Sequence, residues 1–95
     1  MAVAVEVNFP GATIAQFDEA IKIIGAVPGG RHPGEGALFH WATQTDSGVR
    51  VTDVWETKEQ FERFREDVIV PNSGRAGLPE PEFRVIDVHE YMTAR

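Results

Sequence analysis

Four short segments of the chain are rich in apolar and β-branched residues, a composition typical of β-strands. In the first, valine and phenylalanine alternate with smaller or polar residues, so one face of that strand is expected to be buried. The second and third flank the turn signal Asp46-Ser47-Gly48, which predicts a β-hairpin. The four segments are residues 3–9, 37–43, 49–55 and 83–91.

Two other segments carry apolar residues at the spacing of amphipathic helices. The first follows Thr13, which forms a capping box with Gln16, and Gly25 is a plausible C-cap. The second begins at Thr57 with the same motif, and we expect it to end before Pro71, because proline lacks the N–H that an α-helix needs. The apolar stripes are Ile14, Phe17, Ile21 and Ile24 in the first helix and Phe61, Phe64 and Val68 in the second.

This order of elements, βαββαβ, predicts a ferredoxin-like α+β fold in a single domain, residues 1–95. Right-handed crossovers place the first and third strands at the centre of a four-stranded antiparallel sheet and the second and fourth at its edges. Two helices cover only one face of such a sheet, so we expect a second copy of the chain to cover the other. The uncovered face is expected to carry Phe39 or Leu38, Val54 or Trp55, and Ile86 or Val88.

Composition removes several classes of function. The chain contains no cysteine, which excludes a thiol nucleophile and cysteine-ligated metal centres. Its net charge of −6 argues against a nucleic-acid partner, because such proteins normally present a basic face. No apolar stretch is long enough to span a membrane, and the N-terminus lacks a secretory signal, so we expect a cytoplasmic protein.

His40 and Asp53 lie on the two strands of the predicted hairpin, and such a dyad can remove a proton from an acidic phenol or enol. A four-residue turn, 45–48, pairs the two directly, whereas a three-residue loop with Gly48 in a bulge turns His40 to the opposite face. The structural alternative is a histidine in the dimer interface and an aspartate satisfied by backbone or by Arg50.

The chain has three histidines, His32, His40 and His89, but we expect no metal site. The second and fourth strands are opposite edges of the sheet, so His40 and His89 cannot share an ion within one protomer. Residues 26–36 contain several glycines and prolines and are expected to form a surface loop. Arg31 and His32 would give this loop a basic tip, either as part of a lid or simply in solvent.

Several features occur together: Gly36-Ala37-Leu38-Phe39-His40, Gly48, Val51-Thr52-Asp53-Val54-Trp55-Glu56, Phe61-Glu62-Arg63-Phe64, and Val88-His89. Taken together they resemble small bacterial dimeric α/β-barrel proteins of the antibiotic biosynthesis monooxygenase-like superfamily. The resemblance spans nearly the whole chain and implies a ferredoxin-like protomer whose sheet packs face to face with a second copy. It implies no single activity, because the superfamily includes cofactor-free oxygenases, haem-degrading enzymes and isomerase-like enzymes.

The resemblance also suggests functional residues. Haem-degrading relatives share a first-strand asparagine, here Asn8, but place a histidine on the second helix, and residues 58–69 contain none, so we expect no haem and no other cofactor. Cofactor-free oxygenases of the superfamily use Asn, Trp and Tyr, for which Asn8, Trp41 or Trp55, and Tyr91 are the candidates. Trp55 is also the better candidate for core packing, and Phe39 completes the predicted ligand-binding aromatic residues.

We therefore expect a homodimer that binds a hydrophobic or aromatic small molecule between sheet and helices. If it is an enzyme, the predicted chemistry is cofactor-independent proton removal, with His40, Asp53 and Asn8 as catalytic residues. The alternative is a structural or binding domain with a filled core and no activity. A cavity between the sheet and the helices distinguishes the two.

Overall fold

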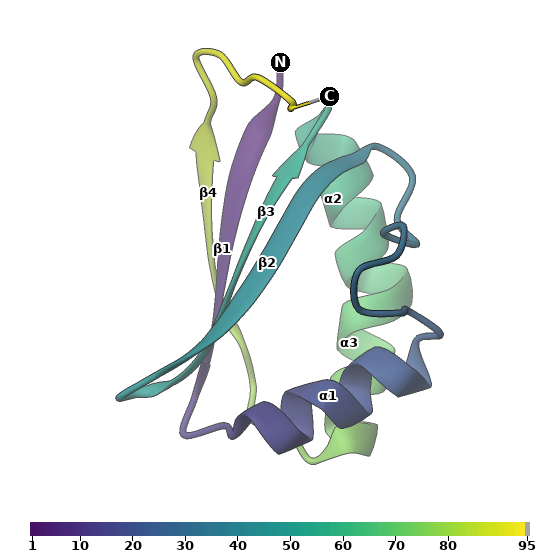
Figure 1. Cartoon of the computed structure of the whole chain (residues 1–95), viewed down its shortest axis with the longest axis vertical. Helices are drawn as coiled ribbons and strands as arrows, with labels where there is room; N and C mark the ends of the chain where they lie inside the picture. The colour runs from purple at the N-terminus through teal and green to yellow at the C-terminus, as the bar shows by residue number, and fades with distance from the viewer. Residues whose placement is uncertain (95) are drawn as a thin grey trace.

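The computed structural model describes residues 1–94 as one antiparallel sheet with helices packed on one side of it (Figure 1). The strand order β2-β3-β1-β4 confirms the predicted ferredoxin-like α+β fold, with the first and third strands central. The strands are β1 (Val3–Pro10), β2 (Ala37–Thr45), β3 (Gly48–Trp55) and β4 (Glu82–Asp87). Within the described residues, no helix is both long and apolar enough to cross a membrane.

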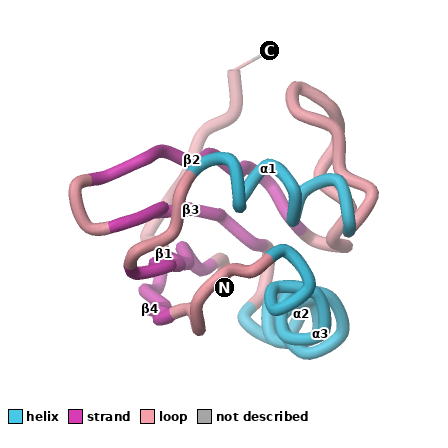
Figure 2. The backbone as a smooth tube through the Cα atoms, turned by 90° about the horizontal axis from the view of Figure 1, so that it is seen from below, coloured by secondary structure: helices cyan, strands magenta, loops and turns pink. Residues whose placement is uncertain are grey.

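Both helical segments lie on the same side of the sheet (Figure 2). Helix α1 (Ile14–Ile23) begins at Thr13, and both hydrogen bonds of the predicted capping box with Gln16 are present. Gly25 follows the helix with a φ of 78°, as expected of a glycine at this end. The second segment comprises α2 (Lys58–Phe64), η1 (Arg65–Ile69), α3 (Val70–Ser73) and η2 (Gly74–Ala76).

The predicted end of the second helix before Pro71 is wrong. The residues ahead of the proline, 65–69, form a π-helical turn, and Pro71 then lies in the first turn of α3, where its missing N–H is tolerated. Side chains just beyond add support, because Asn72 Nδ2 donates to the Val68 carbonyl at 2.8 Å and Ser73 Oγ donates to the Ile69 carbonyl at 2.7 Å. The helical segment is therefore longer than the sequence pattern indicated.

The last strand is shorter than predicted, because β4 ends at Asp87 and not at Tyr91. Strand β4 pairs only with β1, and Asp87 is opposite Val3, the first residue of β1. Beyond this point one further backbone bond forms, from Val88 N–H to the Ala2 carbonyl at 3.0 Å. A strand without a neighbour cannot continue the ladder, so Tyr91 lies outside the sheet.

The hairpin has the first of the two predicted registers. Thr45 is opposite Gly48, and counting back along both strands places His40 directly opposite Asp53. Both side chains therefore point to the same face of the sheet. One irregularity, at Leu38 between Ala37 and Phe39, lies beyond this pair and leaves it unchanged.

The face toward the helices holds the core, and the other face does not. Val3, Val5 and Val7 of β1 and Val49 and Val51 of β3 are buried on the inner face; with them the core comprises Phe9, Ala12, Trp55, Phe61 and Leu78. On the outer face, a row of apolar side chains crosses all four strands in the order Phe39, Val54, Ala4, Ile86. Phe39 is 65% exposed and Ile86 44%, so this face is open in the single chain.

We predict that Gly48→Ala destabilises the fold by about 1–3 kcal/mol. Gly48 has a φ of 148°, and a Cβ there would collide with the Phe9 carbonyl oxygen. Gly74→Ala is the matched control, because a Cβ at Gly74 meets nothing within 4 Å and its φ is −64°. This control should be neutral or stabilise by up to about 1 kcal/mol. Urea denaturation of both variants measures the difference, and equal midpoints would contradict the role of the turn.

Candidate active site

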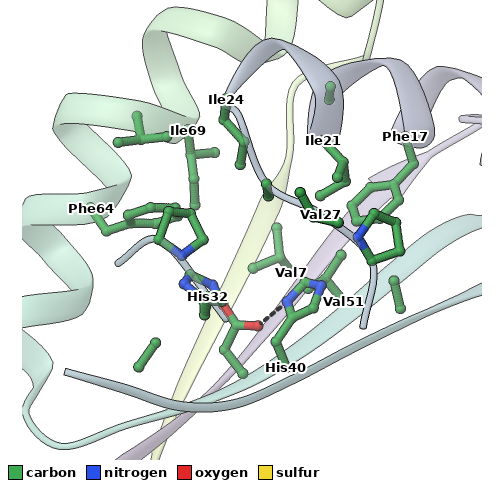
Figure 3. A pocket seen from close by; sticks show the side chains of 18 of the residues that line it. Val7, Phe17, Ile21, Ile24, Val27, His32, His40, Val51, Phe64 and Ile69 are labelled. Carbon is green, nitrogen blue, oxygen red and sulfur yellow. Dashed lines mark hydrogen bonds and ion pairs between the residues drawn. The ribbon is translucent and has the colours of Figure 1, made fainter. Parts of the chain in front are cut away.

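A cavity of about 900 Å³ lies between the inner face of the sheet, helix α1 and the loop at residues 26–33 (Figure 3). It exists because α1 does not close onto the sheet: none of its residues is fully buried. Phe17 and Ile21 of α1 and Ile24 just after it line the cavity, opposite Val7 and Val51 of the sheet. Its size falls in the range of small-molecule sites, and its walls are largely apolar.

One corner of this apolar cavity is polar, and the His40–Asp53 pair forms its centre. His40 Nδ1 lies 2.6 Å from Asp53 Oδ1. A carboxylate only accepts hydrogen bonds, so Nδ1 carries the proton, and in the neutral imidazole His40 Nε2 is left with a lone pair. Asp53 is 3% exposed, whereas the His40 side chain is 31% exposed and lines the cavity.

The other carboxylate oxygen of Asp53, Oδ2, accepts a hydrogen bond from a core residue. Trp55 Nε1 donates to Asp53 Oδ2 at 3.3 Å. Trp55 is fully buried and packs against Phe61 and Phe64, with ring centroids 5.8 and 5.3 Å away. Trp55 therefore has the core role that the sequence favoured for it, and its N–H also orients the carboxylate.

The position of His32 differs from the one predicted from the sequence. The expectation of a basic loop tip is wrong for it: the side chain folds inward, is 15% exposed, and places Nε2 3.9 Å from Asp53 Oδ2. Its ring packs against Trp55 and Phe64, with centroids 5.3 and 5.1 Å away. Burial lowers the pKa of His32 from its ordinary value of 6.5; the Asp53 carboxylate opposes this shift and the His40 ring adds to it.

His32, His40 and Asp53 each offer a ligand atom within 4.8 Å of the others, a set that suits a divalent metal ion. The proximity of His32 and His40 was not foreseen, because the prediction weighed only His40 against His89. One hydrogen bond opposes metal binding here: Gly34 N–H donates to His32 Nδ1 at 2.9 Å. A histidine that ligates a metal through one nitrogen normally donates a proton from the other, and this nitrogen is an acceptor.

The remaining predicted residues lie elsewhere. Asn8 is on the outer face, where it donates to Glu6 Oε1 at 3.2 Å and accepts from Arg50 Nε at 3.0 Å. Trp41, opposite Thr52, is 46% exposed on that face. Among the described residues, the cavity lining includes Phe39, which is 65% exposed, but not Asn8, Trp41 or the exposed Tyr91.

No family model and no curated protein sequence matches this chain. Solved structures do. SnoaB, a cofactor-independent oxygenase from Streptomyces nogalater, superposes with a TM-score of 0.63 at 14% identity, over 98% of this chain and 97% of that one. Rv0793 from Mycobacterium tuberculosis gives a TM-score of 0.66 at 13% identity, over 98% and 100%.

A third structure is a monooxygenase from the gene ActVA-Orf6 of Streptomyces coelicolor in complex with the ligand nanaomycin D. Its TM-score is 0.59 at 16% identity, over 99% of this chain and 92% of that one. The chain has the same fold as these proteins and as putative antibiotic biosynthesis monooxygenases from Deinococcus radiodurans and Chloroflexus aurantiacus. This confirms the resemblance seen in the sequence, and at these identities the likeness establishes the fold and leaves the activity to the site itself.

We predict that His32 makes the fold less stable in mild acid. Because its folded-state pKa is lowered, the unfolded chain binds more protons once the pH falls below about 6.5, so the stability present above that value is lost on acidification. The thermal midpoint of the wild type should therefore fall more steeply from pH 7.5 to 5 than that of His32→Phe. His89→Phe, at an exposed histidine, should keep the wild-type slope, and parallel curves for wild type and His32→Phe would contradict the prediction.

Proposed function

We propose that the protein binds a hydrophobic or aromatic small molecule in the cavity and that His40 removes a proton from it. The observation that carries this proposal is the 2.6 Å contact between His40 Nδ1 and Asp53 Oδ1. It leaves His40 Nε2 as a basic lone pair beside an apolar volume of about 900 Å³. An imidazole oriented in this way by a carboxylate is a common general base.

The apolar walls support an aromatic ligand, and the neighbours support its oxidation. One structural neighbour is described as a cofactor-independent oxygenase and another was solved with nanaomycin D bound. For a substrate with an acidic CH₂ between two aromatic rings, proton removal yields an electron-rich carbanion that molecular oxygen oxidises. The CH₂ group and O₂ give C=O and H₂O, so the substrate supplies all four electrons and no further reductant is required.

The alternative, an inert domain with a filled core, has less support. A filled core requires side chains to occupy the space between sheet and helices, whereas α1 buries no residue completely and stands over a cavity. A buried carboxylate paired with a half-exposed histidine is also unnecessary for packing, because apolar residues of similar volume fill such positions at no cost in desolvation.

We predict that His40→Gln lowers the rate of substrate oxidation by about 10²–10⁴-fold. Asp53→Asn should lower it as well, because an amide does not fix the tautomer that leaves Nε2 basic. Oxygen uptake with a panel of anthrones measures the rate, and ¹⁸O₂ labelling measures transfer of one oxygen atom to the product. Lys58→Ala, at an exposed ion pair with Glu62, is the control.

Loss of activity in the two site variants with an unchanged control supports the proposal. Two results would count against it: oxidation that His40→Gln leaves intact, or a wild-type protein that neither binds nor oxidises any compound of the panel. Thermal stabilisation of the native protein by each compound measures binding independently of turnover, since a ligand that binds only the folded state must raise the midpoint.

We also propose that two copies associate through the outer face of the sheet. The apolar row of Phe39, Val54, Ala4 and Ile86 crosses this face, and Trp41 lies beside it. Three of these side chains, Phe39, Trp41 and Ile86, are large and exposed in the single chain. An apolar patch of this kind on a small domain typically marks an interface.

We predict that Ile86→Lys shifts the protein from dimer to monomer in analytical ultracentrifugation at micromolar concentration. A lysine at the β4 end of the row would bury an unpaired charge in the interface. Val27→Lys is the matched control, because Val27 is 69% exposed but lies on the loop beside the cavity. A monomeric wild type would refute the association.

A further inference from the structure

His32 offers the cavity a hydrogen-bond donor that the protein itself does not use. Its Nε2 forms no hydrogen bond to the part of the chain that the structure describes, and Asp53 Oδ2 lies 3.9 Å from it, beyond hydrogen-bond distance. In the part of the chain that the structure describes, every fully buried side-chain nitrogen or oxygen has a hydrogen-bond partner. His32 Nε2 has no such partner, so it is not fully buried and stays accessible from the cavity. The His32 side chain is among the residues that line it (Figure 3).

The protonation state of His32 Nε2 follows from the hydrogen bond at the other ring nitrogen, Nδ1. His32 Nδ1 accepts a hydrogen bond from Gly34 N–H at 2.9 Å, so it carries no proton. In the neutral imidazole the proton is then on Nε2, and burial favours the neutral form. The two histidines of the site are thus opposite tautomers: His32 presents an N–H to the cavity and His40 presents a lone pair.

We propose that His32 Nε2–H binds the substrate oxygen that becomes negatively charged when His40 removes the proton. This inference rests on the proposed function and names the substrate class more closely: an enolisable ketone or its phenolic equivalent. The ring centroids of the two histidines are 5.4 Å apart and both side chains line the cavity, so one small molecule can reach both. A substrate carbonyl on His32 sets its acidic carbon beside His40.

The step is balanced within the two side chains and the substrate. The C–H bond breaks, its proton forms an N–H bond at His40 Nε2, and its electron pair becomes the C=C bond of an enolate. The carbonyl π electrons move to oxygen, where the His32 N–H stabilises the charge that develops. A neutral imidazole suits this role, because it donates to the oxygen without transferring a full proton.

Histidine tautomers are measured directly by two-bond ¹H–¹⁵N NMR spectra of ¹⁵N-histidine-labelled protein at pH 7.5. We expect His32 as the Nε2–H form and His40 as the Nδ1–H form. A protonated His32, or an Nδ1–H tautomer, would overturn the proposal without any ligand or activity measurement. Coordination of added Zn²⁺ through His32 Nε2 would overturn it too, because the lone pair needed for a metal replaces the proton needed for the substrate.

Ligand binding tests the donor itself. The probes are 1-acetylnaphthalene, whose carbonyl only accepts hydrogen bonds, and 1-isopropylnaphthalene, which has a similar shape and no acceptor. Fluorescence quenching should show about tenfold tighter binding of the ketone to the wild type, the effect of one hydrogen bond in a desolvated site. A lone pair on His40 cannot bind a carbonyl oxygen, so the preference reports on donors alone.

The preference should disappear in His32→Phe, which keeps an aromatic ring between Trp55 and Phe64, and return in part in His32→Gln, which restores an N–H. Lys58→Met is the control, because Lys58 is an exposed donor outside the cavity lining and its loss should leave the preference unchanged. A preference that survives in His32→Phe would overturn this inference while cavity binding stands. If neither naphthalene binds the wild type, the proposed function fails together with it.

Discussion

The register of the β2–β3 hairpin is the constraint on which the site depends. Side chains of a strand alternate between its faces, so a slip of one residue would move His40 to the outer face while Asp53 stayed on the inner one. The register is fixed at the turn, where Thr45 is opposite Gly48 and Gly11 N–H donates to the Ser47 carbonyl at 2.7 Å. A backbone contact far from the cavity thereby determines whether a base exists.

The parts of the fold that the sequence predicted are those decided by local rules. Alternation along β1 and the capping box at Thr13 act over a few residues, and they appear as expected. At Thr57 the N-cap bond from Gln60 N–H is present, but Gln60 Oε1 accepts from Thr57 Oγ1 in place of the backbone N–H. The predictions were wrong where contact with a neighbouring segment determines where a helix or strand ends. Pro71 is tolerated because the preceding five residues widen into a π-helical turn, and β4 stops at Asp87 because β1 offers no partner beyond Val3. Neither cause is visible in the affected segment alone.

The same distinction holds for the site. Sequence reasoning named His40 and Asp53 and reduced their relationship to two registers, because a hairpin leaves only a few ways to pair its strands. It did not find His32, which reaches Asp53 from a loop whose path no periodicity determines. One local signal was present: in His32-Pro33-Gly34 the proline carries no N–H, so the next amide, that of Gly34, is free to turn back to the His32 ring.

The buried Asp53 carboxylate explains why His40, Trp55 and His32 lie close together. A carboxylate that is 3% exposed has lost most of its hydration, a cost of several kcal/mol unless donors replace the water. The chain supplies two hydrogen bonds, from His40 of β2 and from Trp55 of β3, and His32 lies 3.9 Å away without forming a third. An apolar residue at this position would be the simpler way to fill a core. The fold instead retains a costly charge, whose effect is to orient the His40 imidazole beside the apolar cavity.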